Sequence, residues 1–247
     1  MTTAWRSYLN RSLDALRSNS QQVLRASPEN PHGGVLPLLA FRTPEDIQQY
    51  ALGCDADLGG KSTVALDLGP EGKGRFYGRL SNDLNPGRRK EGVIERGGYA
   101  GFRNKQRTSF FGTQTWDTSL HDFLRLRVKS SGDGMRYFVN IQTDGPVRSD
   151  LFQHRLWLPQ PASDSAPHEW TDVLIPFDDF ALTNSGDMSG QQLEMLRTGV
   201  RTVGISVLGP LEGRYELGID SIDAVSAEVA SRLNDLPPQK DADGNPL

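Results

Sequence analysis

Hydrophobic and polar residues alternate in short stretches along most of the chain. The clearest case spans residues 124–142, where every second residue of two successive stretches is apolar: Leu124, Leu126 and Val128, then Tyr137, Val139 and Ile141. Turn-forming residues fill 130–134 between them. A period of two is typical of half-buried strands, so we predict a hairpin with one buried face. The other face is basic and rich in amides, and it consists of Arg125, Arg127, Arg136, Phe138, Asn140 and Gln142.

Similar strand patterns recur on both sides of this hairpin, at 62–68, 74–80, 97–103, 151–158, 169–180, 202–209 and 213–225. Gly, Pro, Asn and Asp separate them, and no long helical crossovers lie between them. This arrangement favours an all-β sandwich.

Two short helices are predicted within this β-rich region. The first begins after Thr43, which suits an N-cap, with Pro44 at the first helical position and Asp46 closing a capping box. The second spans 191–198 and ends at Gly199.

The first residues have a different character from the rest of the chain. One face of a helix would carry four apolar residues, namely Trp5, Leu9, Leu13 and Leu16. Arginine and serine dominate the remaining positions. The pattern suits an amphipathic helix docked on the domain, a mitochondrial targeting segment or a helix on a membrane surface. We therefore expect an N-terminal helix and linker over 1–40, the sandwich over 41–227 and a mobile tail over 228–247.

Charge and composition narrow the function classes. The net charge of −4 argues against nucleic-acid binding by the whole chain, and the single cysteine excludes an internal disulfide. Residues 87–107 form the exception, with seven basic residues and two acidic ones. We interpret this segment either as a solvated loop or as a docking site for an acidic partner or anionic lipid headgroups. Its candidate contacts are Arg88, Arg89, Lys90, Arg103, Lys105 and Arg107.

Catalytic and metal-binding motifs are incomplete. The stretch at 58–63 lacks the first glycine of a phosphate loop, and Asp55 with Asp57 lacks the bidentate glutamate of a calcium loop. No pair of histidines has metal-ligand spacing. We expect no enzyme activity, cofactor or metal. The open alternatives are an isolated calcium site in a loop and a hydrolase with an unrecognised site.

Five ordered segments resemble the complex I intermediate-associated protein family over about residues 41–225: FRTPEDIQQYALGCDADLGGKSTVAL, GGYAGFR, LRLRVKSSGDGMRYFVNIQT, WTDVLIPFDDF and VGISVLGPLEGRYELGIDSIDAV. The matching points are Gly59-Gly60 with Ser62, Gly98-Tyr99, Asp133-Gly134 before Tyr137 and Asn140, Pro176-Phe177 and Gly218-Ile219-Asp220.

This resemblance implies a jelly-roll sandwich of the galactose-binding type, similar to carbohydrate-binding modules. It also implies a non-enzymatic assembly factor for mitochondrial NADH:ubiquinone oxidoreductase (complex I). Such a protein holds membrane-arm intermediates in the matrix, at the inner membrane, and leaves before the enzyme is mature. The implied partners are membrane-arm subunits and other assembly factors, with peripheral contact to anionic membrane. The alternative is a carbohydrate-binding-module-like protein that uses the polar face around Arg136 and Phe138.

Overall fold

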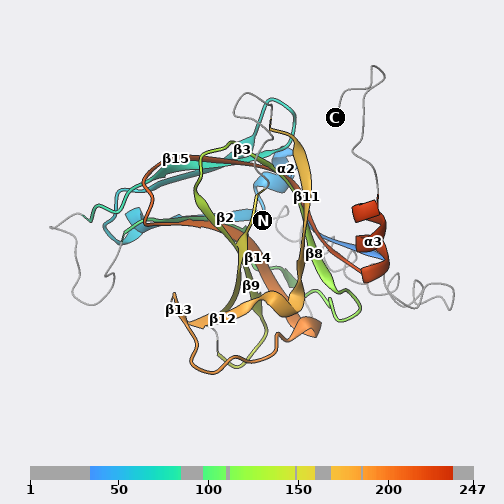
Figure 1. Cartoon of the computed structure of the whole chain (residues 1–247). Helices are drawn as coiled ribbons and strands as arrows, with labels where there is room; N and C mark the ends of the chain where they lie inside the picture. Colours follow the sequence, from blue (N-terminus) through green and yellow to red (C-terminus); the bar gives the residue numbers. More distant parts are fainter. Residues whose placement is uncertain are drawn as a thin grey trace, which may run out of the picture.

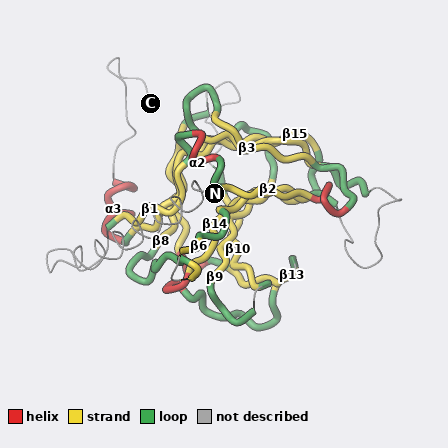
Figure 2. Tube along the Cα trace, turned by 180° about the vertical axis from the view of Figure 1, so that it is seen from behind, coloured by secondary structure: helices red, strands yellow, loops and turns green. Residues whose placement is uncertain are grey.

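The computed structural model describes residues 34–84, 97–109, 112–147, 149–158, 168–184 and 186–235, which form two antiparallel sheets packed against each other (Figure 1). Seen from behind, strands and loops make up nearly all of the described chain (Figure 2). The predicted all-β sandwich is confirmed. The helix expected near the N-terminus lies outside the described residues.

The six-stranded sheet contains strands from both ends of the described chain. Its order is β11 (Trp170–Pro176), β8 (Phe123–Ser130), β15 (Gly213–Val225), β4 (Gly74–Leu80) and β3 (Thr63–Leu68), with β1 (Val35–Ala40) also paired to β15. Residues 35–40, which the sequence leads us to expect in a linker, form a strand of this sheet. The pairing of β1 with β15 shifts register between Pro37 and Leu39, and Leu38 and Leu39 are both buried. This bulge removes the alternation by which a strand is recognised in a sequence.

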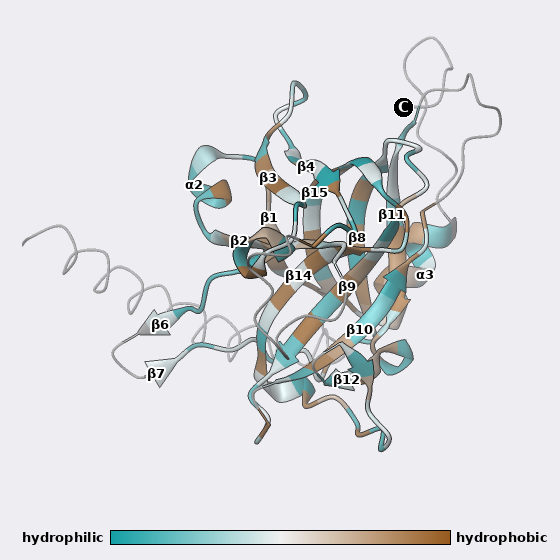
Figure 3. Cartoon of the chain, turned by 90° about the vertical axis from the view of Figure 1, so that its left-hand side faces the viewer, coloured by the Kyte–Doolittle hydropathy of each residue, from teal (hydrophilic) through white to brown (hydrophobic). Residues whose placement is uncertain are grey.

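The second sheet has seven strands. Its order is β13 (Asp187–Met188), β12 (Ala181–Asn184), β10 (Asp150–Leu156), β9 (Arg136–Thr143), β14 (Val200–Leu208), β5 (Tyr99–Asn104) and β2 (Tyr50–Cys54). A separate ribbon of β6 (Thr108–Ser109) and β7 (Gly112–Thr113) extends from the sandwich (Figure 3).

The predicted hairpin at 123–143 is wrong, although both of its strands exist. β8 belongs to the six-stranded sheet and β9 to the seven-stranded sheet, so the chain crosses from one layer to the other. Asp133 fixes this crossover, because its carboxylate accepts hydrogen bonds from the Tyr137 hydroxyl (2.5 Å) and the Glu216 amide (2.9 Å). The two apolar rows face each other across the core. Alternation alone does not distinguish this arrangement from a hairpin, and here the two polar rows lie on opposite outer faces.

Helices are few and short. The capping box of α2 (Pro44–Ile47) is confirmed, with the Asp46 amide donating to Thr43 Oγ1 at 3.1 Å. The helix predicted at 191–198 is wrong except for the 3-10 turn η4 (Arg197–Gly199). There the Gln192 side chain instead bonds to both the amide and the carbonyl of Leu182, at 2.7 and 3.0 Å.

Two further 3-10 turns are η1 (Asp55–Leu58) and η3 (Phe177–Asp179). The segment expected as a tail begins with the helix α3 (Ala227–Asp235), and residues 236–247 lie outside the described part of the chain.

The core between the sheets is built around aromatic rings. Phe41 and Tyr50 stack with ring centroids 4.5 Å apart, and Phe76 meets Phe102 edge to face at 5.0 Å. Phe41 and Phe76 are fully buried. Aromatic pairs of this kind add to the stabilisation from burying apolar surface.

A buried carboxylate ties the two sheets together at one end. Asp55 accepts hydrogen bonds from the Ser62 amide (2.9 Å) and hydroxyl (2.8 Å), just before β3. It also accepts from the amides of Gly98 (2.6 Å) and Tyr99 (3.3 Å), at the start of β5. A Cβ at Gly60 would lie 2.3 Å from the Asp55 carboxyl carbon, so this close approach requires glycine.

We predict that Asp55→Asn destabilises the protein by about 3 kcal/mol, because its NH₂ group would face N–H donors and the charged acceptor would be lost. Urea unfolding followed by fluorescence measures this difference. Asp57→Asn is the matched control on the same turn, where the side chain is exposed, and we expect a change below about 0.5 kcal/mol. Equal effects of the two substitutions would contradict the role assigned to Asp55.

Candidate functional site

The outer face of the seven-stranded sheet brings together residues from strands that are far apart in sequence. β14, β9 and β10 lie side by side (Figure 3), and β5 flanks β14. One register row across them contains Gly101, Ser206, Phe138 and Arg155; a second contains Arg103, Gly204, Asn140 and Gln153. We call the large side chains here the basic-aromatic face, defined as Tyr99, Arg103, Arg136, Phe138, Arg155 and Trp157.

Small residues form the floor of this face. Gly101, Gly204 and Ser206 are buried beneath the taller side chains of their neighbours. A Cβ at Gly101 would lie 3.1 Å from the Tyr99 hydroxyl, so the Tyr99 side chain extends over this glycine. Burial raises the pKa of the Tyr99 hydroxyl, against the opposing effect of the Arg103 charge. The phenol therefore stays neutral at physiological pH.

A chain of side-chain hydrogen bonds runs across the same floor. Asn140 donates to Ser206 Oγ at 2.9 Å and accepts from Gln153 at 2.8 Å. Gln142 accepts from the Thr202 hydroxyl at 3.1 Å. The side-chain amides of Asn140 and Gln142 are therefore hydrogen-bonded within the sheet, where they hold the floor of this face in place.

The arginines of the basic-aromatic face are not neutralised by the part of the protein that the structure describes. Within the described residues, Arg103, Arg136 and Arg155 form no ion pair. Arg155 stacks on Trp157 with its guanidinium carbon 4.0 Å from the ring centroid, and the Trp157 residue is 63% exposed. Cations and aromatic surface are thus both available to a partner here.

On the opposite outer face, which belongs to the six-stranded sheet, arginines are paired with aspartates of the protein. Arg125 pairs with Asp223 at 2.6 Å, and Arg127 pairs with Asp172 at 2.9 Å. Asp220 binds Arg42 at 2.7 Å. Burial alone would raise the pKa of Asp220, but the hydrogen bond and charge of Arg42 outweigh it and hold this pKa below its usual value. The charges of Arg125 and Arg127 are therefore used inside the protein.

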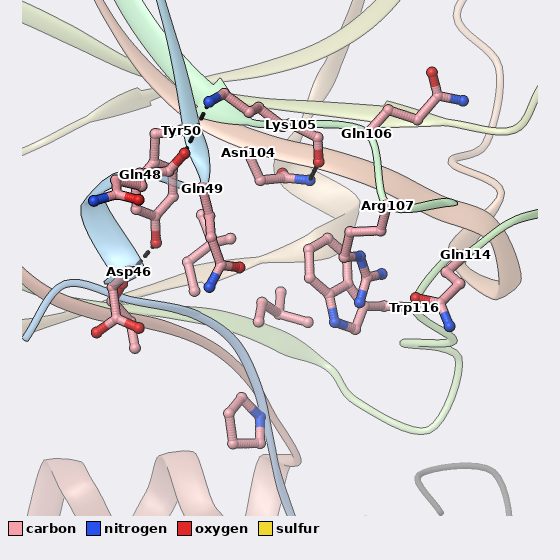
Figure 4. Close-up of a pocket in the computed structure, with 14 residues that line it drawn as sticks. Asp46, Gln48, Gln49, Tyr50, Asn104, Lys105, Gln106, Arg107, Gln114 and Trp116 are labelled. Atoms are coloured by element: carbon pink, nitrogen blue, oxygen red, sulfur yellow. Dashed lines mark hydrogen bonds between the residues drawn. The ribbon is translucent and has the colours of Figure 1, made fainter. Parts of the chain in front are cut away.

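Two other predicted residues line a pocket beyond the end of β5. Lys105 donates from its ammonium group to the Gln48 carbonyl at 2.8 Å, and Arg107 lies over the ring of Trp116 (Figure 4). The remaining candidates, Arg88, Arg89 and Lys90, lie outside the described residues.

The structure thus divides the predicted residues among separate regions. Arg103, Arg136, Phe138 and the two amides share the seven-stranded face, whereas Arg125 and Arg127 lie on the opposite side. Sequence reasoning missed the aromatic residues Tyr99 and Trp157. Tyr99 precedes Arg103 by four positions and Trp157 follows Arg155 by two, which puts each on the same face as an arginine. This signal has meaning only once the neighbouring strands are known.

Within the part of the chain that the structure describes, no three His, Cys, Asp or Glu residues are grouped so as to hold a metal ion. Across these same residues, no helix has the length and apolar character needed to cross a bilayer.

A family profile and individual relatives both match this chain, and they name the same family. The profile of the family described as complex I intermediate-associated protein 30 (CIA30) matches residues 39–219. The chain is 35% identical to the mitochondrial complex I intermediate-associated protein 30 of Neurospora crassa, over 90% of this chain and 84% of that protein. The Drosophila melanogaster protein of the same name is 32% identical over 74% of this chain and 60% of its own length.

Among solved structures, the sandwich is similar to a family 11 carbohydrate-binding module from Clostridium thermocellum in complex with a β-1,3-1,4-mixed-linked tetrasaccharide. The TM-score is 0.51 at 13% identity, with 78% of this chain and 96% of the module covered. At this identity the likeness shows the fold alone, and it confirms the expected jelly-roll architecture.

We predict that the two groups of arginines differ in their effect on stability. Arg125→Ala leaves Asp223, whose side chain is 6% exposed, without its cation, so we expect a loss of about 2–4 kcal/mol. Arg136→Ala removes an exposed, unpaired side chain and should change stability by less than about 0.5 kcal/mol. Urea unfolding of both variants tests this. Similar losses would show that Arg136 has a structural role.

Proposed function

The chain belongs to the complex I intermediate-associated protein 30 family, and on this basis we propose that it is an assembly factor without catalytic activity. In this proposal it binds membrane-arm intermediates of mitochondrial respiratory complex I, together with other assembly factors. Relatives named mitochondrial support the compartment. We place the protein in the matrix, peripheral to the inner membrane.

The basic-aromatic face is the observation that carries the binding surface in this proposal. Arginine and large aromatic residues contribute most of the energy in many protein interfaces. Here they stand on a sheet whose floor is fixed by hydrogen bonds, so little order has to be created on binding. Unpaired arginines favour an acidic partner surface, and this attraction also speeds encounter. On the six-stranded face, Arg125 and Arg127 are already paired with acids, which leaves them less available to a partner.

Peripheral attachment is the second element of the proposal. We assign it to the basic segment 87–107, for contact with anionic headgroups or an acidic partner. Attachment of this kind weakens in salt, because charges are screened over about 8 Å at physiological ionic strength.

A carbohydrate-binding role is the second candidate. Tyr99 lies over Gly101, and Phe138 and Arg136 stand on the same outer face two strands away. Together they present aromatic surface and hydrogen-bond donors, which is the combination that sugar rings use. The same residues would serve both roles, so the ligand class has to be decided by measurement.

We predict that the tagged full-length protein, captured from mitochondrial detergent extract, brings down membrane-arm subunits in a native-gel band smaller than mature complex I. Arg103→Glu/Arg136→Glu should reduce this recovery about tenfold or more, because it places two acids where the partner is acidic. The matched control is Arg79→Glu/Arg214→Glu. These two exposed arginines lie opposite each other on the neighbouring strands β4 and β15 of the other sheet. We expect full recovery from it.

Mass spectrometry of the band gives the outcome. If wild-type protein captured no complex I subunit, the assembly role would be refuted. The carbohydrate-binding role would then be tested by glycan screening. Equal recovery by both double variants would keep the assembly role and refute the assigned surface.

A further inference from the structure

Arg107 is a half-buried arginine with two buried, unpartnered nitrogen atoms. Its guanidinium lies 3.4 Å above the centroid of the Trp116 ring, in a pocket of about 690 Å³ (Figure 4). Its Nε and Nη2 atoms are buried, and neither has a hydrogen-bond partner in the described chain. Buried donors without partners are rare in folded proteins and costly, so these two ask for an explanation.

Nε and Nη2 form one side of the guanidinium, whose N–H groups match the two oxygens of a carboxylate. The protein itself shows what this edge binds. Three other arginines direct the same two nitrogens to an aspartate: Arg42 to Asp220 (2.7 and 3.1 Å), Arg75 to Asp67 (3.0 and 3.0 Å) and Arg125 to Asp223 (3.2 and 2.6 Å). Arg107 has the same edge without the acid, and because both nitrogens are covered in this structure, an acid reaches them only when the neighbouring side chains move aside.

The acid within the pocket is already engaged. Asp46 lines the pocket, but its carboxylate accepts from the Arg42 and Thr43 amides, both at 3.0 Å, as part of the cap of α2. Burial lowers the pKa of Arg107 to about 10, so the side chain is still charged at neutral pH. An incoming anion would relieve the cost of burying this cation.

The rest of the pocket is suited to peptide groups. Four glutamines from two separate loops line it: Gln48, Gln49, Gln106 and Gln114. An amide side chain both donates and accepts, as a peptide group does. The volume also exceeds what a single carboxylate fills, so the pocket has room for the chain that carries the acid.

We propose that this pocket binds an aspartate or glutamate side chain of a partner protein, held side-on by Nε and Nη2 of Arg107. The surrounding glutamines contact the peptide groups on either side of the acid. The proposal rests on the assembly role only in taking the partner to be a protein. The site is separate from the basic-aromatic face, since it lies beyond the end of β5, between β1, the α2–β2 segment and the Arg107–Trp116 loop.

The test uses the purified full-length protein, ¹⁵N-labelled at arginine, and two blocked pentapeptides with glutamate or glutamine at the centre of four alanines. The Nε–Hε resonance of Arg107 is the one that disappears in Arg107→Lys. We expect the glutamate peptide to shift this resonance and the glutamine peptide to leave it in place. Arg107→Lys keeps the charge but loses the two-pronged geometry, so its affinity for the glutamate peptide, measured by isothermal titration calorimetry, should weaken about tenfold or more.

Arg79→Lys is the matched control, because Arg79 is an exposed arginine of β4 on the other sheet, outside the pocket, and this variant should bind the glutamate peptide as wild type does. Urea midpoints of both lysine variants establish that each is folded.

Several results would overturn the proposal. These are equal binding of the two peptides, unchanged affinity in Arg107→Lys, or an Arg107 resonance that is indifferent to the glutamate peptide. Binding of inorganic phosphate without binding of the glutamate peptide would do the same. These outcomes are independent of the assembly role. If wild-type protein captured no complex I subunit while the glutamate peptide bound, the assembly role would fail and the pocket would stand.

Discussion

The Asp55 carboxylate is the constraint on which the arrangement of the two sheets depends at the end where β3 and β5 begin. It accepts four hydrogen bonds, two from Ser62 and one each from the amides of Gly98 and Tyr99. A single buried charge therefore fixes a strand in each layer. Because one of its donors is the Tyr99 amide, the same interaction sets the start of β5 and thereby the position of an aromatic ring on the candidate surface. Stability and binding geometry are linked at this point.

A second carboxylate has the same role at the crossover from β8 to β9. Asp133 joins Tyr137 in one sheet to Glu216 in the other. These two sites account for six of the residues on which the family resemblance rests: Gly60, Ser62, Gly98 and Tyr99 surround Asp55, whereas Asp133 and Tyr137 form the crossover. Asp220 is likewise part of an ion pair. The recognisable motifs are thus the parts that hold the sandwich together, and they identify the fold far better than they identify the partner.

The same distinction explains what could be predicted from the sequence. The strands at 74–80 and 213–225 were predicted with their observed bounds, because a buried face imposes a strict period of two. The strand β1 was not predicted, because its bulge breaks the period of two. The candidate surface was only partly predictable. Whether an arginine is free depends on acids distant in sequence: Asp223 lies 98 positions from Arg125, and Asp220 lies 178 positions from Arg42. No local pattern distinguishes Arg125 from Arg136.

The three settings of arginine in this protein imply different contributions to recognition. Arg125 and Arg127 are neutralised by acids of the same sheet face, so they add stability and give a partner little to attract. Arg103 and Arg136 are exposed and form no ion pair with another described residue. On a chain whose net charge is −4, they make a local positive region. Charges in such a position mainly guide encounter and orientation. Arg107 is buried against Trp116, where water competes little and a paired acid would be released slowly. An acidic partner that engaged both regions would be steered by the exposed arginines and retained by the buried one.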